Sequence, residues 1–311
     1  MRIMFMGTPE IAETCLKEII GTGLEVCAVV TREDKPRGRG NVMTPTPVKV
    51  LAEANGIPVY TPKTLRDDDF MAILDEHKPE IIVVVAYGKI LPPAVIDYPT
   101  YGCINAHVSL LPKYRGAAPM QRAIMDGESE TGVSIMYMDE GLDTGDVILT
   151  ESFPITEDDD FESIHDRSAE VGARLLCKAI ADIENGAATR TVQDNTLATY
   201  AAKIEKEDCK IDFNLDSKIV SARIRGVTPI PGAFAFLNGK MLKICRVKAV
   251  AHGGGSPGLV TEINGVGDGS FTVSCQSGSI IVTSVKPEGK GIMSAGDFIR
   301  GRKIEKGNML D

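Results

Sequence analysis

The amino-acid sequence predicts an α/β protein in which a parallel-rich sheet is followed by a small β-barrel. Residues 2–30 read as strand, helix, strand, and strands alternating with helices are typical of parallel sheets. From residue 211 onward, short apolar runs are instead separated by glycines at regular intervals, which favours a barrel of short strands. At 311 residues the chain is also long enough for two domains.

The domain organisation follows from where these patterns change. We expect a first domain over residues 1–190, a linker over 191–206 where the periodicity weakens, and a second domain over 207–311. Residues 1–206 hold 20 Lys and Arg against 33 Asp and Glu, whereas residues 207–311 hold 14 against 10. This asymmetry indicates a second domain that faces a polyanion, and OB-type barrels commonly bind nucleic acid. Modest charge differences between domains are also common, so charge alone leaves this open.

Composition excludes several classes of protein. No apolar run approaches the ~20 residues that span a bilayer, and the apolar block at residues 3–6 is too short for a signal peptide. The seven cysteines lack a C-x-x-C spacing, which favours reduced thiols in a cytosol over disulfides or a zinc site. The four histidines are not closely spaced. We therefore expect a cytoplasmic, metal-free protein with no membrane contact that acts as a monomer.

The first elements form a strand–helix–strand unit. A strand is predicted at Arg2–Met6, a helix from about Glu10 to Gly21, and a strand at Glu25–Val30. The turn between the first two reads Gly-Thr-Pro, and proline suits the first turn of a helix. This turn has neither the G-x-G-x-x-G fingerprint nor a Walker loop, which argues against a dinucleotide or P-loop site.

Residues 31–47 are predicted to form a long polar loop. It carries Arg37 and Arg39, and glycines flank Arg39. Loops of this length are usually functional or disordered, and guanidinium groups beside flexible glycines suit a nucleic-acid phosphate backbone. The alternative is a solvated surface loop, which a charged run by itself favours.

The remaining elements of the first domain alternate between helices and strands. Helices are predicted at 47–55, 67–77, 120–125 and 161–185, and strands at 59–60, 81–85, 131–138 and 147–154. The run Ile81–Val85 is uninterrupted and β-branched, as in strands buried on both faces. It leads into the connection Tyr87–Leu91, whose backbone could contact a planar ligand or could be an ordinary strand–helix connection. In the second domain, strands are predicted at 232–237, 241–251, 258–263, 270–274 and 280–285.

The stretch Cys103–Gly116 contains the first candidate catalytic residues. Asn105 and His107 lie two positions apart in a predicted strand, so their side chains project from the same face. Pro112 cannot continue a central strand, so both residues lie at a carboxyl end of the sheet, where open α/β sheets bind ligands. An asparagine N–H and an imidazole suit chemistry at a carbonyl. The alternative is a buried histidine bonded to a backbone carbonyl and an asparagine that closes a turn.

An acidic loop at residues 138–146 supplies the third candidate. Asp143 lies between Gly141 and Gly145, which would allow it to enter a tight site. A carboxylate beside His107 would hold the imidazole in its protonated form. Aspartate and glycine also cluster in ordinary turns, so this loop by itself does not establish a site.

The order of short motifs along the whole chain is far more specific than any of them alone. These motifs are Met6–Pro9, Asp34–Pro36 through Gly38–Gly40, Pro47–Ala52, Val84–Gly88, Ile104–His107, Ser109–Pro112, Tyr114–Pro119 and Gly141–Asp146. On these motifs the chain resembles the folate-dependent formyltransferase family, and within it the enzymes that formylate methionyl-tRNA. The one difference in the core motif is Ala106, where the family usually has Val, and this residue should face away from the site.

The resemblance implies a Rossmann-like domain, an OB-like barrel and a specific reaction. Members of the family transfer a formyl group from 10-formyltetrahydrofolate to the α-amino group of methionine on initiator tRNA. The resemblance implies Asn105, His107 and Asp143 as catalytic residues and Arg37 and Arg39 as tRNA contacts. It implies a folate site made of Tyr87, Gly88, Lys89, Ile90, Leu91, Ser109, Leu110, Leu111 and Pro112.

Two alternatives remain at this point. A related enzyme could use the same three residues on a small amine, such as a ribonucleotide or an amino sugar, although a small acceptor needs neither a basic loop nor a barrel. The chain could also be a non-catalytic RNA-binding protein, which the presence of all three catalytic residue types argues against. Which barrel residues contact tRNA is not readable from the sequence.

Overall fold

The computed structural model describes residues 1–37, 40–265, 267–301 and 303–311. They form two compact units, each assembled from several segments of the chain. The first unit comprises Met1–Gly116, Gly132–Phe153 and His165–Tyr200, and the second comprises Ala117–Thr131, Pro154–Ile164 and Ala201–Asp311. Neither unit is continuous in sequence, and the domain boundaries expected at 190 and 207 stay a prediction.

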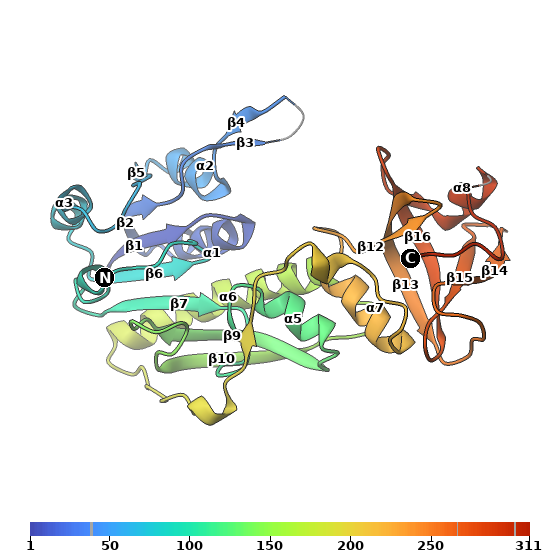
Figure 1. The fold of residues 1–311 in the computed structure, drawn as a ribbon. Coiled ribbons are helices and arrows are strands. Elements are labelled where there is room, and N and C mark those ends of the chain that lie inside the picture. Colours follow the sequence, from blue (N-terminus) through green and yellow to red (C-terminus); the bar gives the residue numbers. More distant parts are fainter. Residues whose placement is uncertain (38–39, 266, 302) are drawn as a thin grey trace. The chain divides into compact units, whose positions relative to one another are not determined.

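The first unit is built on a seven-stranded sheet in the order β10-β9-β7-β6-β1-β2-β5 (Figure 1). Neighbours from β7 to β5 are parallel, and β9 runs antiparallel to β7. The predicted parallel-rich sheet is therefore confirmed. Its strands are β1 (Arg2–Gly7), β2 (Glu25–Val30), β5 (Val59–Tyr60), β6 (Ile81–Val85), β7 (Cys103–His107), β9 (Glu130–Tyr137) and β10 (Val147–Pro154).

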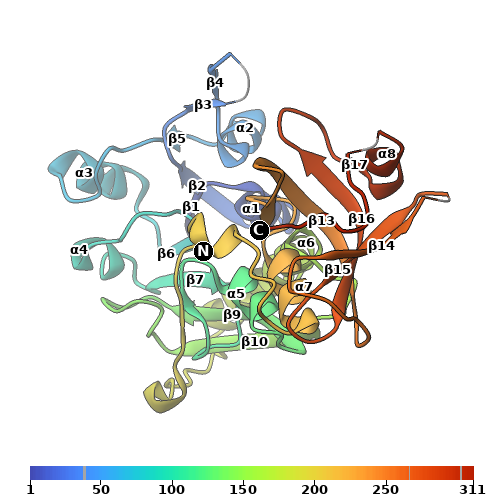
Figure 2. The same ribbon diagram turned by 45° about the vertical axis from the view of Figure 1, so that its right-hand side comes forward.

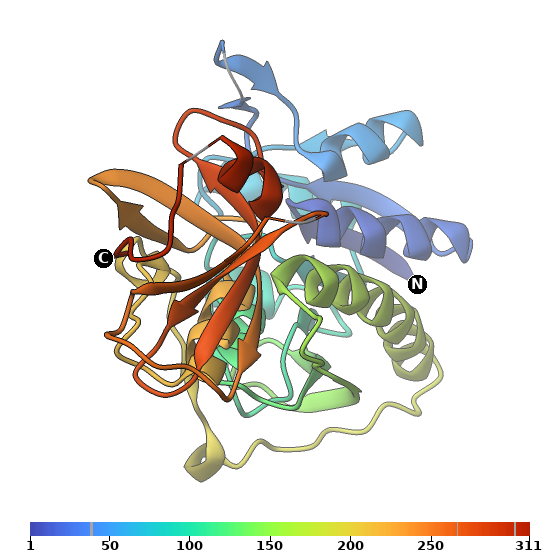
Figure 3. The ribbon, with the colours of Figure 1, turned by 90° about the vertical axis from the view of Figure 1, so that its right-hand side faces the viewer.

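Helices cover this sheet, and their ends follow from local capping. The side chain of Thr46 accepts a hydrogen bond from Lys49 N at the start of α2, and Asp67 caps α3 by accepting from Phe70 N, as N-cap residues do. The long helix α6 lies beside α1 (Figure 3), where a Cβ added at Gly172 would lie 3.9 Å from Cys15 Sγ. The helices of the first unit are α1 (Glu10–Gly21), α2 (Pro47–Ala54), α3 (Asp68–His77), α4 (Pro93–Ile96) and most of α6 (Phe161–Glu184), whereas α5 (Pro119–Met125) belongs to the second unit.

The predicted loop at residues 31–47 contains a hairpin, so its prediction as irregular structure was wrong. Strands β3 (Lys35–Arg37) and β4 (Val42–Thr44) pair antiparallel. Lys49 Nζ donates to both carboxylate oxygens of Asp34 at 3.0 Å, which fastens the base of the hairpin to α2. The sequence pattern missed it because three-residue strands carry too little periodicity to be recognised.

The second unit contains an antiparallel sheet in the order β12-β13-β16-β15-β14, with β17 paired to β16 (Figure 2). Residues 307–311 bridge its two outer strands: Asp311 exchanges hydrogen bonds with Phe236 on β12, and Val260 N on β14 donates to Asn308 O. These bonds close the sheet on itself, as a barrel requires. The strands are β12 (Phe234–Leu237), β13 (Lys240–Val250), β14 (Val260–Asn264), β15 (Ser270–Ser274), β16 (Ser279–Pro287) and β17 (Met293–Ser294).

Two helices of the second unit were not expected from the sequence. In α7 (Ser217–Gly226), Val220, Ala222 and Ile224 are buried, and this spacing of two mimics a strand. Asp216 caps the helix by accepting from Lys218 N. The short helix α8 (Ala295–Arg300) begins after Ser294, whose side chain accepts from Asp297 N. In both cases the capping residue was the readable signal.

Candidate active site

Asn105 and His107 lie on β7, between the parallel β6 and the antiparallel β9. His107, which is 6% exposed, ends the strand, and Asn105 is partly exposed. Within the described part of the chain, the side-chain amide of Asn105 makes no hydrogen bond with another residue. Both of its N–H groups are therefore available to a ligand.

The His107 ring lies between two hydrogen-bond acceptors. Its Nε2 is 2.9 Å from the carbonyl oxygen of Tyr114, and its Nδ1 is 3.6 Å from Asp143 Oδ2. The second distance is too long for a hydrogen bond, although catalytic contacts are often long before substrate binds. Both ring nitrogens therefore face an oxygen atom, and an imidazolium has an N–H group on each of them.

Asp143 reaches the site from the loop between β9 and β10. Its Oδ2 accepts a hydrogen bond from Gly116 N at 2.8 Å, and its backbone is left-handed with φ 54°. Gly145, two residues later, has to be a glycine, because a Cβ there would collide with the carbonyl oxygen of Tyr137. The structure thus brings Asp143 to His107, and this loop is not an ordinary solvated turn.

Sequence reasoning missed a buried polar network behind these residues. Arg115, 2% exposed, donates from Nε and Nη2 to Gln193 Oε1 at 3.1 and 2.7 Å, and from Nη2 to Asn195 Oδ1 at 2.8 Å. Gln193 lies in the segment predicted as a linker, yet it hydrogen-bonds the Asp143 loop. Its only sequence signal was a polar residue among weakly patterned neighbours.

The turn Ser109–Pro112 directly follows β7. Ser109 Oγ donates to Lys113 O at 2.7 Å, so the serine hydroxyl is used within the turn. Ser134 on β9 fastens the turn to the sheet: its Oγ donates to Ser109 O at 2.8 Å and accepts from Leu111 N at 3.2 Å. The Leu110 side chain packs against Gly132 on the same strand. The predicted ligand contacts here therefore lie on a rigid turn.

The predicted ligand segment Tyr87–Leu91 follows the neighbouring strand β6. The side chains of Tyr87 and Leu91 are buried, whereas Ile90 is 84% exposed. Arg32 Nη2 donates to the Gly88 carbonyl, and Lys89 Nζ donates to the carbonyls of Pro62 and Lys63. Ligand contacts from this segment are thus limited to backbone groups and to Ile90.

Tyr87 carries an unusual polar group for a buried position. Its hydroxyl has no hydrogen-bond partner among the described residues, and burial raises the pKa of Tyr87 to about 12. A buried polar atom without a partner costs free energy.

One of the two predicted tRNA contacts lies on the β3–β4 hairpin. The backbone of Arg37 ends β3, opposite Val42. Arg39 lies outside the described residues. The hairpin belongs to the first unit, as do all the other predicted site residues.

The described ranges contain neither a candidate metal-binding cluster nor a candidate membrane-spanning helix. No group of three or more His, Cys, Asp or Glu side chains there could hold a metal ion. No helix in that part of the chain is long and apolar enough to cross a membrane.

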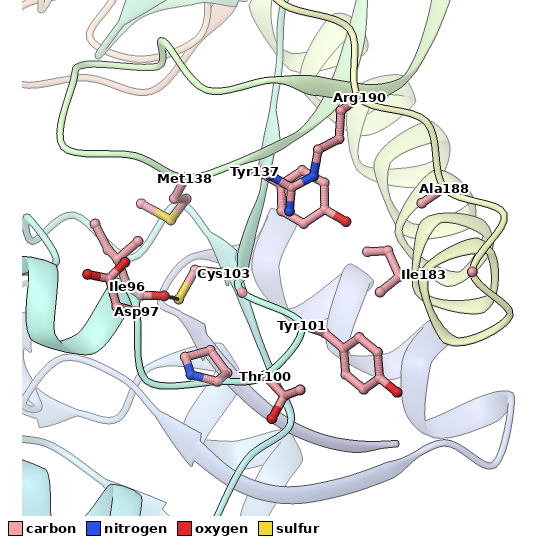
Figure 4. Close-up of a pocket in the computed structure, with 13 residues that line it drawn as sticks. Ile96, Asp97, Thr100, Tyr101, Cys103, Tyr137, Met138, Ile183, Ala188 and Arg190 are labelled. Carbon is pink, nitrogen blue, oxygen red and sulfur yellow. Dashed lines mark hydrogen bonds between the residues drawn. The ribbon is translucent and has the colours of Figure 1, made fainter.

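A cavity of about 460 Å³ lies away from these residues (Figure 4). Cys103, the first residue of β7, lines it together with Tyr137 and Arg190, whose guanidinium lies 3.7 Å from the centre of the Tyr137 ring. His107 ends the same strand and does not line the cavity. The cavity is therefore separate from the candidate active site.

Comparison with known proteins decides the family. Residues 1–180 match the family model described as formyl transferase, and residues 203–303 match the model of the formyl transferase C-terminal domain. The chain belongs to the formyltransferase family. The resemblance and the fold class predicted from the sequence are thereby confirmed.

Similarity to named formyltransferases extends along the whole chain. A methionyl-tRNA formyltransferase of Citrifermentans bemidjiense is 46% identical over 310 residues, covering 100% of this chain and 96% of the relative. A protein of the same name from Geotalea daltonii is 47% identical, covering 100% and 98%.

Solved structures of other formyltransferases share the fold. HypX from Aquifex aeolicus in complex with tetrahydrofolic acid superposes with a TM-score of 0.67 at 19% identity, covering 100% of this chain and 50% of that one. An N-formyltransferase from Helicobacter canadensis, in complex with folinic acid and dTDP-3-aminofucose, gives 0.66 at 21% identity, covering 90% and 97%. At these identities the likeness concerns the fold alone.

Proposed function

We propose that this formyltransferase transfers the formyl group of 10-formyltetrahydrofolate to the α-amino group of methionine on initiator tRNA. The observation that carries the proposal is full-length identity of 46–47% with proteins named methionyl-tRNA formyltransferase. Identity with the two superposed formyltransferase structures, one of them bound to a nucleotide sugar, is 19–21%. Such a reaction belongs to the cytoplasm, where we expect the protein to act as a monomer without a metal ion.

The folate co-substrate would bind beyond the carboxyl ends of β6 and β7. The structural neighbours named above are complexes with tetrahydrofolic acid and with folinic acid, and parallel sheets bind ligands at this edge. The rigid turn Ser109–Pro112 and the segment Tyr87–Leu91 would flank it. The exposed Ile90 side chain offers apolar contact.

Catalysis would depend on stabilising the charge that develops at the formyl oxygen. The neutral methionyl amine attacks the formyl carbon, and the free N–H groups of Asn105 would donate to the resulting oxyanion. A protonated His107 would stabilise the same oxyanion. As the tetrahedral intermediate collapses, the folate nitrogen leaves and takes up a proton, and the amine loses one.

His107 would transfer these protons, and Asp143 would assist it. The imidazolium can give a proton to the departing nitrogen and recover one from the amine, directly or through water. Asp143 would hold the imidazole charged and oriented, as the carboxylate does in other catalytic pairs. The tRNA would be held by the β3–β4 hairpin with Arg37 and Arg39, and by the second unit.

The direct test is formyl transfer from 10-formyltetrahydrofolate, with methionylated initiator and elongator tRNA assayed side by side. We expect rapid formylation of the initiator and little of the elongator. Folate turnover without transfer to tRNA would indicate that the acceptor is a small amine, such as an amino sugar. No folate reaction at all would exclude the proposal.

A further inference from the structure

One segment of the chain contacts both loops that supply the acceptors facing the His107 ring. Those acceptors are the carbonyl oxygen of Tyr114 and the carboxylate of Asp143. Tyr114 N donates to Thr199 Oγ1 at 2.9 Å. The loop of Asp143 is bonded to Gln193. Residues 193–199 follow α6 and lie about 50 to 85 positions further along the chain than the residues they contact.

The Gln193 side chain uses its whole hydrogen-bonding capacity in this network. Nε2 donates to Asp143 O at 3.0 Å and to Gly145 O at 2.7 Å. Oε1 accepts from Nε and Nη2 of Arg115 at 3.1 and 2.7 Å. An amide has two N–H donors and one oxygen with two lone pairs, so all are occupied. The residue is 8% exposed, and water cannot readily replace these bonds.

Asp143 needs such support because its local conformation is unfavourable. A non-glycine residue with φ 54° is held in a sparsely populated region, and such residues persist only where the surroundings impose them. Gln193 bonds the carbonyls of Asp143 and of Gly145 two residues later, and so spans the strained backbone. The carboxylate itself is bonded separately, to Gly116 N.

We propose that Gln193 is a positioning residue that acts through Asp143 and sets its approach to His107. The proposal rests on the function proposed above, since it assumes that His107 and Asp143 carry the chemistry. It also gives residues 191–200 a second function, because they would support the active site as well as connect the domains. The hydrogen bonds of the Gln193 side chain go to Arg115 and to the backbone of the Asp143 loop, and none goes to Asn105, to His107 or to the Asp143 carboxylate.

The substitution Gln193→Glu separates positioning from folding. A glutamate keeps an oxygen for Arg115 and pairs with its charge, so the buried arginine stays satisfied. It replaces the Nε2 donor with an acceptor that faces two carbonyl oxygens, which repels the Asp143 loop. Asn195→Ala is the matched control, because it removes one bond from Arg115 and none from the Asp143 loop.

The experiment is a double-mutant cycle on formyl transfer with Gln193→Glu, Asp143→Asn and the combination of both. We expect Gln193→Glu to lower kcat about 10- to 100-fold, as misplacement of a catalytic group does. The KM of both substrates should stay near that of the wild type, and the melting temperature should fall by only a few degrees, because two buried hydrogen bonds to the loop are lost. In the Asp143→Asn background the same change should cost less than about 3-fold, because its target has been removed. Asn195→Ala should leave kcat within about 3-fold in either background.

Two outcomes would overturn the proposal. One is a Gln193→Glu variant with wild-type kcat, and the other is a loss that persists undiminished in the Asp143→Asn background. A wild-type chain that does not formylate methionyl-tRNA would instead contradict the proposed function. In that case the ring nitrogen chemical shifts of His107, measured by NMR in the free protein, still test positioning. Gln193→Glu should move them, and Asn195→Ala should not; unchanged shifts in Gln193→Glu would overturn the proposal.

Discussion

At the scale of single residues, the chemistry is determined by which atoms remain unsatisfied in the free protein. His107 faces a carbonyl and a carboxylate, so its two ring nitrogens are both directed at acceptors. Asn105, two positions earlier on the same strand, has an amide without a partner in the described part of the chain. A histidine ring beside free N–H groups is an arrangement suited to stabilising an oxyanion.

Replacement of Asn105 by alanine tests this arrangement. We expect kcat for formyl transfer to fall by about 10²–10³, which is the usual loss when one oxyanion donor is removed. The melting temperature should change little, because the amide makes no bond within the described chain. The measurement is steady-state kinetics together with thermal unfolding.

Ala106→Val serves as the control for that experiment. It changes the neighbouring residue on the opposite face of β7, and we expect it to retain activity near that of the wild type. An Asn105→Ala variant with nearly full turnover would refute the role given to the amide.

At the scale of elements, side chains from separate segments hold the second unit together. Arg122 on α5 binds both carboxylate oxygens of Asp208, at 3.0 and 2.8 Å, and donates to the carbonyls of Ala202 and Lys203. Arg225 on α7 donates from Nη1 to the carbonyls of Thr156 and Asp159, and burial lowers its pKa. These bonds explain why residues 117–131 and 154–164 belong to this unit.

The pair of Arg122 and Asp208 predicts a pH-dependent contribution to stability. The Arg122 guanidinium holds the pKa of Asp208 below its ordinary value. The stabilisation is therefore fully present above the unfolded carboxyl pKa of about 4 and is lost as pH falls through the lower folded pKa. At pH 7, Asp208→Asn should lower the free energy of unfolding by about 1 kcal/mol, as expected for a bidentate but partly exposed pair.

Urea unfolding at pH 7 and at about pH 3 measures this effect. The difference between the wild type and Asp208→Asn should shrink as the wild-type carboxylate is protonated. Glu151→Gln removes an exposed partner of Arg174 and should change stability by less than about 0.5 kcal/mol. A difference that is the same at both pH values would show that the pair does not act through charge.

At the scale of the whole molecule, packing within the two units keeps all seven cysteines at least partly out of contact with solvent. Each is free and at least partly buried. Burial raises the pKa of Cys15, Cys103 and Cys275 to about 12 and that of Cys177 to about 11. Since the thiolate is the reactive form, these residues are structural and not nucleophiles.

We expect the native protein to react slowly with a thiol reagent such as dithiobis-nitrobenzoate at pH 8. The partly buried Cys177 and Cys245 should react before the other five, and all seven should react at once in denaturant. The release of thionitrobenzoate with time measures this order. Rapid reaction of Cys15 or Cys103 in the native state would contradict the packing described here.

The local patterns of the sequence determined most elements and part of the site. Strand alternation places Asn105 and His107 on one face, and Pro112 ends that strand, because side-chain direction and proline chemistry depend on a few neighbouring residues. The parallel-rich sheet and the short strands of the second domain were predicted in the same way. Where a local pattern was ambiguous, as in α7, or too short, as in the β3–β4 hairpin, the prediction failed.

Only the tertiary structure decided what holds these residues in place. Gln193 meets Arg115 across 78 positions and Asp143 across 50, and no periodicity connects residues so far apart. A single polar residue in a weakly patterned segment looks like part of a linker in the sequence. The role proposed for Gln193 arises because its side-chain amide bonds both Arg115 and the Asp143 loop. The contact between these segments depends on the packing of the whole unit, which only the folded chain specifies.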